Sequence, residues 1–190
     1  MTDRHALSST LAPRIAPGDR RSVGTVNWLI AWVSGRVSGT PPLNLFLVLG
    51  RHRRLFRGWL RFAGRLMPGG RLPRRETELV ILRVAHLRGC DYEFEHHRRL
   101  AARAGVTEAE IARLTRAADA EWSPRELAIL DAVDAMHHAG DISDAAWDAL
   151  RSHLDERAAI ELVLLAAHYE MLATTIAALR VPLDEKRRRG

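Results

Sequence analysis

The sequence is poor in cysteine, lysine and aromatic residues. Its 190 residues include one cysteine, Cys90, and one lysine, Lys186, and only 6% are aromatic. A single cysteine cannot form an intramolecular disulfide, which excludes a small secreted fold held by disulfides and favours a reducing cytoplasm. The net charge of +6 therefore rests on arginine. Such an arginine bias is typical of GC-rich genomes, so the charge alone predicts no nucleic-acid partner.

Long hydrophobic runs are also missing. No uninterrupted run reaches the roughly 18 to 20 apolar residues that a membrane span needs. The most apolar early segment, Val26–Val33, is short, lies far from the start and is not followed by a small-residue cleavage site, so we predict neither a signal peptide nor a membrane partner. With 47% hydrophobic and 27% charged residues, the chain has the composition of a soluble globular protein.

Helical periodicity and capping signals dominate the chain, and no segment shows the period-two alternation of a strand. We therefore expect an all-α fold. Thr107 with Glu110, and Ser123 with Glu126, have the spacing of helix-capping boxes. Helices are predicted at about residues 23–33, 53–67, 73–88, 90–105, 108–118, 124–138, 143–153 and 155–179.

These signals indicate a single folded domain. Residues 1–20 contain prolines and a glycine among polar residues and are predicted to be a poorly ordered arm. Residues 21–184 form the predicted helical domain, and residues 185–190 form a basic tail. The predicted helix 53–67 carries an apolar stripe and an arginine face, which we interpret as a packed helix with a solvated basic surface.

The stretch GCDYEFEHH, residues 89–97, contains several chemically active side chains. On a helix, Cys90, Glu93 and His97 stand at positions i, i+3 and i+7 and therefore share one face. His96 points about a hundred degrees away. If the helix begins near Cys90, its dipole favours a thiolate there, whereas the Glu93 carboxylate opposes one. The sequence leaves this competition open.

Glu78 is expected on a buried stripe, because Ile81, Leu82 and Ala85 follow it at helical spacing. A buried carboxylate either pairs with a cation or has a raised pKa and can exchange protons near neutrality. Arg74 or Arg75 could supply an ion pair. Both interpretations of Glu78 remain open at this stage.

A metal site is disfavoured, although Cys90, Glu93, His96 and His97 are all potential ligands. Neither HExxH nor paired CxxC spacing is present, and adjacent histidines on a helix rarely face one ion. We therefore expect no bound metal. One internal similarity, ELVIL at 78–82 and ELVLL at 161–165, could reflect a helical pair used twice or merely two similar buried helices.

The motifs NLF, RxxELVILRVAxxxGCxYExxxH and ELVLLxxHYxML resemble the carboxymuconolactone decarboxylase family, which includes the alkylhydroperoxidase D-like proteins. The resemblance covers about residues 42–184 and implies a helical fold and homo-oligomers, commonly trimers or hexamers. It also implies that Glu78, Cys90 and His97 occupy the family's glutamate, first-cysteine and histidine positions.

Glu93 stands where the hydroperoxidase branch has its second cysteine. Without that thiol, Cys90 cannot complete a two-cysteine redox cycle within the motif. The resemblance thus favours a cofactor-free enzyme that acts on a small, anionic carboxylate or lactone, with His97 as proton donor, Glu93 or Glu78 as its partner, and Cys90 as a polar wall or secondary donor.

Two alternatives remain. The first is a one-cysteine alkylhydroperoxidase or other thiol-redox protein that uses Cys90, whose sulfenic acid would need an external thiol for recovery. The second is a non-catalytic helical oligomer that binds a small ligand or nucleic acid through its basic surface. We expect nucleic acid to be the less favoured partner, because no recognition-helix pattern is present.

Overall fold

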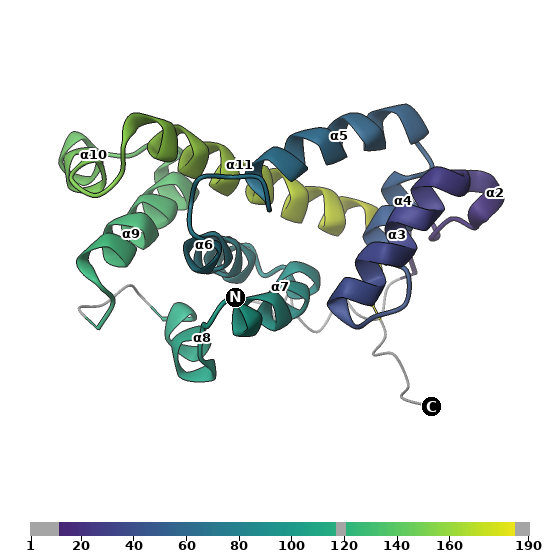
Figure 1. Ribbon diagram of the computed structural model, residues 1–190, viewed down its shortest axis with the longest axis horizontal. Coiled ribbons are helices and arrows are strands. Elements are labelled where there is room, and N and C mark those ends of the chain that lie inside the picture. The colour runs from purple at the N-terminus through teal and green to yellow at the C-terminus, as the bar shows by residue number, and fades with distance from the viewer. Residues whose placement is uncertain (1–11, 117–120, 185–190) are drawn as a thin grey trace. The chain divides into compact units, whose positions relative to one another are not determined.

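The computed structural model describes residues 12–116 and 121–184, and all regular secondary structure in these ranges is helical (Figure 1). The predicted all-α fold is therefore confirmed. The helices are α2 (Arg20–Val23), α3 (Thr25–Ser38), α4 (Asn44–Leu49), α5 (Arg53–Leu66), α6 (Arg74–Leu87), α7 (Asp91–Arg103), α8 (Glu108–Leu114), α9 (Pro124–Ala139), α10 (Asp144–Arg151) and α11 (Glu156–Leu179). Their contacts divide the chain into two units, residues 64–174 and residues 1–63 with 175–190.

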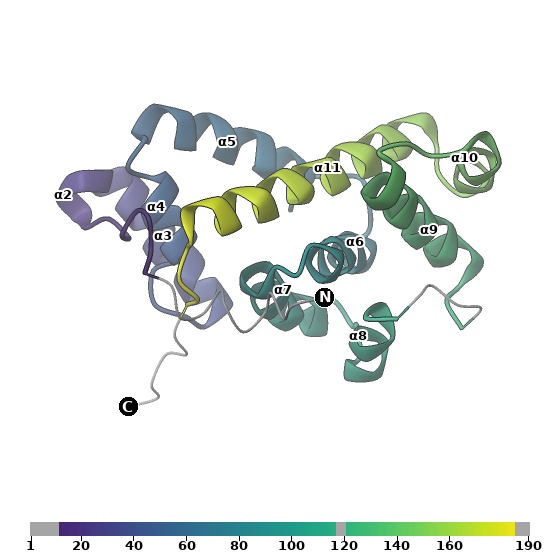
Figure 2. The ribbon, with the colours of Figure 1, turned by 180° about the vertical axis from the view of Figure 1, so that it is seen from behind.

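Helix α6 forms the centre of unit 64–174. It lies between α7 and α9 in both views of the ribbon (Figures 1 and 2). Every residue from Glu76 to Ala85 is buried, as the apolar character of this segment on all its faces predicts. The hydrophobic core beside α6 is formed by Leu79, Leu82, Ala101, Val106, Ile111, Leu114, Trp122 and Leu130.

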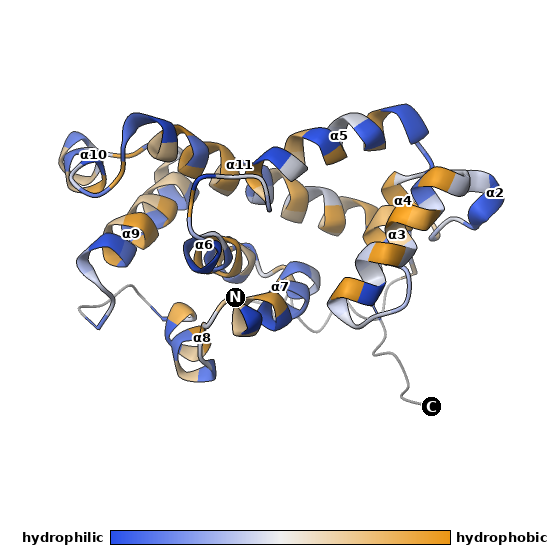
Figure 3. Ribbon diagram, in the orientation of Figure 1, coloured by the Kyte–Doolittle hydropathy of each residue, from blue (hydrophilic) through white to orange (hydrophobic). Residues whose placement is uncertain are grey.

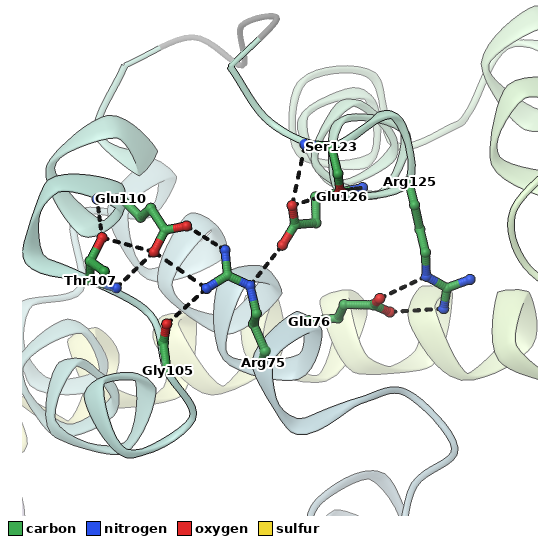
Figure 4. Close-up of polar contacts among 8 residues, drawn as sticks. All are labelled: Arg75, Glu76, Gly105, Thr107, Glu110, Ser123, Arg125 and Glu126. Carbon is green, nitrogen blue, oxygen red and sulfur yellow. Dashed lines mark hydrogen bonds and ion pairs between the residues drawn. The ribbon is translucent and has the colours of Figure 1, made fainter.

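Ion pairs fix α6 to the starts of α8 and α9 (Figure 4). The Arg75 guanidinium donates hydrogen bonds to Glu110 and Glu126, which are also the acidic members of two capping boxes. The partner residues of these boxes are Thr107 and Ser123, so both predicted caps are confirmed. Each glutamate thus caps the start of a helix and anchors that helix to α6 at the same time.

In the other unit, α3, α4 and the start of α5 pack around an aromatic cluster. Phe46 lies against Phe56 and Trp59, with ring centroids 5.3 and 5.7 Å apart. Helix α3 is longer than predicted and ends at Ser38, where Gly39 adopts a left-handed conformation with φ of 73°. The predicted helix 108–118 ends earlier, at Leu114.

Part of the predicted N-terminal arm is held in place. The Gly18 amide donates to the Leu47 carbonyl (3.1 Å), and the Arg14 amide donates to the Leu179 carbonyl (3.1 Å). Residues 12–19 therefore differ from the expected disordered arm, because their backbone groups find partners that composition does not reveal. Residues 1–11 and the predicted tail 185–190 lie outside the described residues.

Helix α11 is long and apolar enough, by length and composition alone, to cross a membrane. The sequence analysis did not predict such a helix, because polar residues interrupt the apolar residues of α11. Core packing accounts for much of its apolar character, since Leu162, Leu165 and Tyr169 are buried. Such a composition is also that of a core helix in a globular fold, so it does not by itself identify a membrane span.

Candidate active site

The candidate site lies within unit 64–174, where α6 and α7 bring their buried polar side chains together. His97 on α7 is the central residue. Its Nδ1 atom lies 2.8 Å from Glu78 Oε2 on α6, and its Nε2 atom lies 3.3 Å from Glu93 Oε2, one helical turn earlier. The imidazole is therefore held between two carboxylates. Three of the four residues predicted for the site are joined in one network.

The charge state of His97 follows from this arrangement. Burial lowers the pKa of the imidazole, but hydrogen bonds and charge interactions with Glu78 and Glu93 outweigh burial and raise its pKa to about 9. Near neutral pH the ring is therefore an imidazolium, and both of its nitrogens donate to carboxylates. A buried cation is tolerated here because two anions share its charge.

Glu78 is fully buried and uses both of its oxygens. Its Oε1 atom forms an ion pair with Arg74, one turn earlier on α6, while Oε2 contacts His97. The sequence left open whether Glu78 belongs to an ion pair or to a proton-handling group. The structure combines both arrangements, because Arg74 pairs with one oxygen and leaves the other for the imidazole.

Cys90 lies at the N-cap of α7, as the sequence predicted. Burial, together with the Glu93 and Asp91 charges, raises the pKa of the thiol to about 12, although hydrogen bonds from the Glu93 and Tyr92 amides act in the opposite direction. The sequence left open whether Cys90 is ionised, and in the structure its burial favours the neutral thiol over the thiolate. At neutral pH, Cys90 is a neutral thiol that can donate a proton or line a cavity but is a poor nucleophile.

The two adjacent histidines occupy different environments, as their helical spacing predicts. His96 is half-buried, and its ring centroid lies 5.2 Å from that of His97. Burial, followed by the positive charges of His97, Arg99 and Arg74, lowers the pKa of His96 to about 3. Within the described residues, no group of three His, Cys, Asp or Glu side chains has an arrangement that could hold a metal ion.

Tyr169 on α11 completes the network and was not among the predicted site residues. Its hydroxyl oxygen lies 3.3 Å from His97 Nε2, and burial raises the pKa of the phenol well above its ordinary value. The residue before it, His168, is also buried, and burial lowers the pKa of its imidazole. Both residues belong to the motif ELVLLxxHYxML. Their position shortly after the repeated pentapeptide was the one feature of the sequence that could have indicated a role in the site.

The repeated pentapeptide does not create a second proton-handling site. Glu161, the counterpart of Glu78, accepts hydrogen bonds from the backbone amides of Arg71 (2.8 and 2.7 Å) and Leu72 (2.9 Å). It thereby fixes the loop that precedes α6. The same five-residue pattern therefore supplies a buried carboxylate to His97 in one helix and a loop anchor in the other.

Comparison with solved structures shows the fold. A peroxidase-related protein from Ralstonia eutropha has a TM-score of 0.80 at 18% identity, over 91% of this chain and 93% of the other. A peroxidase-related protein from a Silicibacter species has a TM-score of 0.76 at 16% identity, over 100% and 98% of the two chains. The debrominase Bmp8 has a TM-score of 0.73 at 17% identity, over 92% and 94%.

Sequence comparison gives a family match for part of the chain. A search of curated proteins finds no match. The model of the carboxymuconolactone decarboxylase family, however, matches residues 53–135, which include α6, α7 and the Glu78, Cys90, Glu93 and His97 positions. The first of the structures above is described as an alkylhydroperoxidase AhpD core, in agreement with this match. Residues 53–135 thus match the carboxymuconolactone decarboxylase family, and the chain has the fold of the peroxidase-related proteins above.

Proposed function

We propose that this protein is a cofactor-free enzyme that transfers a proton through His97 to a small carboxylate or lactone. The observation that carries the proposal is the imidazolium held by Glu78 at 2.8 Å and Glu93 at 3.3 Å. A general acid must be protonated at the working pH and must have a route to recover its proton. The pKa of about 9 meets the first condition, and the Glu93 carboxylate provides a partner for the second.

The proposed reaction is a decarboxylation. The bond between the substrate carboxylate carbon and its neighbour breaks, carbon dioxide leaves, and the electron pair remains as an enolate-like anion. His97 then donates its Nε2 proton to that carbon, and the neutral imidazole regains a proton from solvent. The Cys90 thiol is the most exposed of the four site residues, at 8%. A neutral thiol there avoids repelling an anionic substrate.

The direct test measures carbon dioxide release from carboxymuconolactone and related acids by the purified protein. We expect His97→Gln to lower the rate by a factor of about 10² to 10⁴, which is the usual contribution of a general acid. The control is His96→Gln, because this neighbour has a pKa lowered to about 3 and is an uncharged imidazole at neutral pH. Unchanged release by His97→Gln, or no release by the wild type from any acid, contradicts the proposal.

A second candidate is a one-cysteine thiol-redox enzyme. Two observations favour it: Cys90 stands at a helix N-cap with the Tyr92 and Glu93 amides beside its sulfur, and similar folds occur in peroxidase-related proteins. The pKa of about 12 counts against it, because the thiolate is the reactive form. Trapping of a sulfenic acid at Cys90 after peroxide treatment near neutral pH would support this candidate over the decarboxylase.

We also propose that the protein is a homo-oligomer. Ile160, Leu164 and Met171 are exposed on one stripe of α11, at 51%, 44% and 47% of their full surface. Large apolar side chains aligned on one helix face are typical of an interface between subunits.

A further inference from the structure

A hollow in unit 1–63 with 175–190 is separate from the residues of the candidate active site. It has a volume of about 750 Å³ and is lined by Asp19, Arg20, Arg21, Gly24, Thr25 and Arg53. A smaller hollow of about 210 Å³ shares three of these residues and adds Arg57 from α5. The larger volume falls within the range of about 300 to 1,000 Å³ that small-molecule sites occupy. The hollow is therefore large enough for a small organic ligand.

The charge of this hollow is strongly positive. Within the described residues, none of the guanidiniums of Arg20, Arg21, Arg53 and Arg57 forms an ion pair with a carboxylate. The carboxylate of Asp19 accepts hydrogen bonds from the amide (2.9 Å) and the hydroxyl (2.7 Å) of Ser22. These bonds hold the pKa of Asp19 below its ordinary value. One carboxylate thus faces several guanidiniums, and an anion would relieve their mutual repulsion.

Arg53 is already fixed in place. Its Nε and Nη2 atoms donate to the backbone carbonyls of Ser22 (3.3 Å) and Arg21 (2.6 Å). Its guanidinium lies against Gly24, where a Cβ atom would be only 3.1 Å from Nε. Gly24 also has a φ of 83°, which other residues rarely adopt. Arg53 would therefore lose little conformational entropy on binding an anion. Its Nη1 hydrogens have no acceptor among the described residues.

The start of α3 adds to the positive potential. This helix begins at Thr25, its N-cap Gly24 has no side chain to accept from the first-turn amides, and its first turn contains no acidic residue. The positive end of the helix dipole therefore faces the same region as the arginines. Several guanidiniums beside uncapped amides suit an anion with more than one charge and at least three acceptor oxygens.

We propose that the two hollows, which adjoin at Gly24, Thr25 and Arg53, together bind a phosphate group carried by a small organic phosphate or by a lipid headgroup. A phosphate, unlike a carboxylate, has enough oxygens and charge to engage several guanidiniums at once. The lipid source is considered because Val26, which lines the smaller hollow, begins an exposed apolar stripe that continues through Leu29, Val33 and Val37 on α3. Figure 3 shows orange hydrophobic segments along α3, next to the blue hydrophilic part of α2.

The test measures binding of pyrophosphate and inorganic phosphate to the full chain by calorimetry at moderate salt. We expect saturable binding to one site, weakened about tenfold by Arg57→Gln, which removes one charge-assisted hydrogen bond. Arg54→Gln is the matched control, because it removes the same charge from the same helix but does not line either hollow. Arg57 is exposed, and thermal unfolding of both variants verifies that they remain folded.

The outcomes distinguish the two sources of phosphate. Binding to phosphatidylglycerol vesicles but not to phosphatidylcholine vesicles, with the same dependence on Arg57, assigns the ligand to a lipid headgroup. Binding to pyrophosphate alone assigns it to a soluble phosphate. Equal losses in Arg57→Gln and Arg54→Gln would show diffuse charge attraction and overturn the proposal. So would binding to none of the probes, or binding to single-stranded RNA without binding to pyrophosphate.

Discussion

His97 Nδ1 lies 2.8 Å from Glu78 Oε2, although the two residues belong to different helices and are separated by 19 positions in the chain. The Glu78 carboxylate is buried on α6, and the His97 imidazole that contacts it is buried on α7. Each of these buried charges is stabilised by the other, and Arg74 and Glu93 add a second partner to each. The protonation of this pair therefore determines both the chemistry and the electrostatic balance of the site.

The two adjacent histidines are expected to titrate far apart. His97 should lose its proton near pH 9, because Glu78 and Glu93 outweigh its burial, whereas burial should keep His96 neutral down to about pH 3. NMR titration of the imidazole nitrogens would measure both values. Two histidines that titrate together near the ordinary value of about 6.5 would contradict the arrangement of carboxylates around His97.

The proposed activity should depend on pH through His97. A general acid works in its protonated form, so kcat/KM should be maintained below pH 9 and should fall as the pH rises through about 9. Glu93→Gln removes one of the two anions that raise the His97 pKa, and we expect the loss of activity to move down by about 1 to 3 pH units. Glu95→Gln, on the exposed side of the same helix, is the control. A pH profile that does not move in Glu93→Gln would separate Glu93 from the proton transfer.

Local patterns predicted the helices and the face shared by Glu93 and His97, since these depend on spacing within a few turns. The contact between His97 and Glu78 depends on how α6 packs on α7. The sequence predicted only that Glu78 is buried. Tyr169 could not be assigned, because its contact with His97 spans 72 positions. The ionisation of Cys90 was also open, since it depends on burial by distant residues. The backbone contacts of residues 12–19 were not predicted either, because their partners are also distant in the sequence.

The oligomer proposal predicts that α11 carries an interface. Leu164→Arg places a charge on the exposed apolar stripe of this helix and should convert a larger assembly into smaller species, because burial of an unpaired charge is costly. Light scattering coupled to size-exclusion chromatography measures the mass. The control is Leu183→Arg, an equally exposed leucine that lies outside α11. A wild-type protein that elutes as a monomer, or no change in Leu164→Arg, contradicts the proposed interface.

The stability of unit 64–174 should depend strongly on one buried arginine. Arg83 on α6 forms a bidentate pair with Asp134 on α9, with both distances 2.6 Å, and also donates to the carbonyls of Leu114 and Arg116. Its side chain is only 7% exposed. Arg83→Ala leaves a half-buried carboxylate and two carbonyls without their donor, and we expect it to lower the free energy of unfolding by about 3 to 5 kcal/mol.

The matched control for Arg83 is Arg98→Ala, which removes the solvent-exposed pair between Arg98 and Glu108. Exposed pairs contribute at most about 1 kcal/mol, since water and salt screen the charges. Chemical denaturation of both variants measures the difference. If Arg98→Ala is as destabilising as Arg83→Ala, burial is not what makes the Arg83 pair important. Restoration of stability by Arg83→Met with Asp134→Leu would show instead that the cost of Arg83→Ala comes mainly from the Asp134 carboxylate that it leaves unpaired.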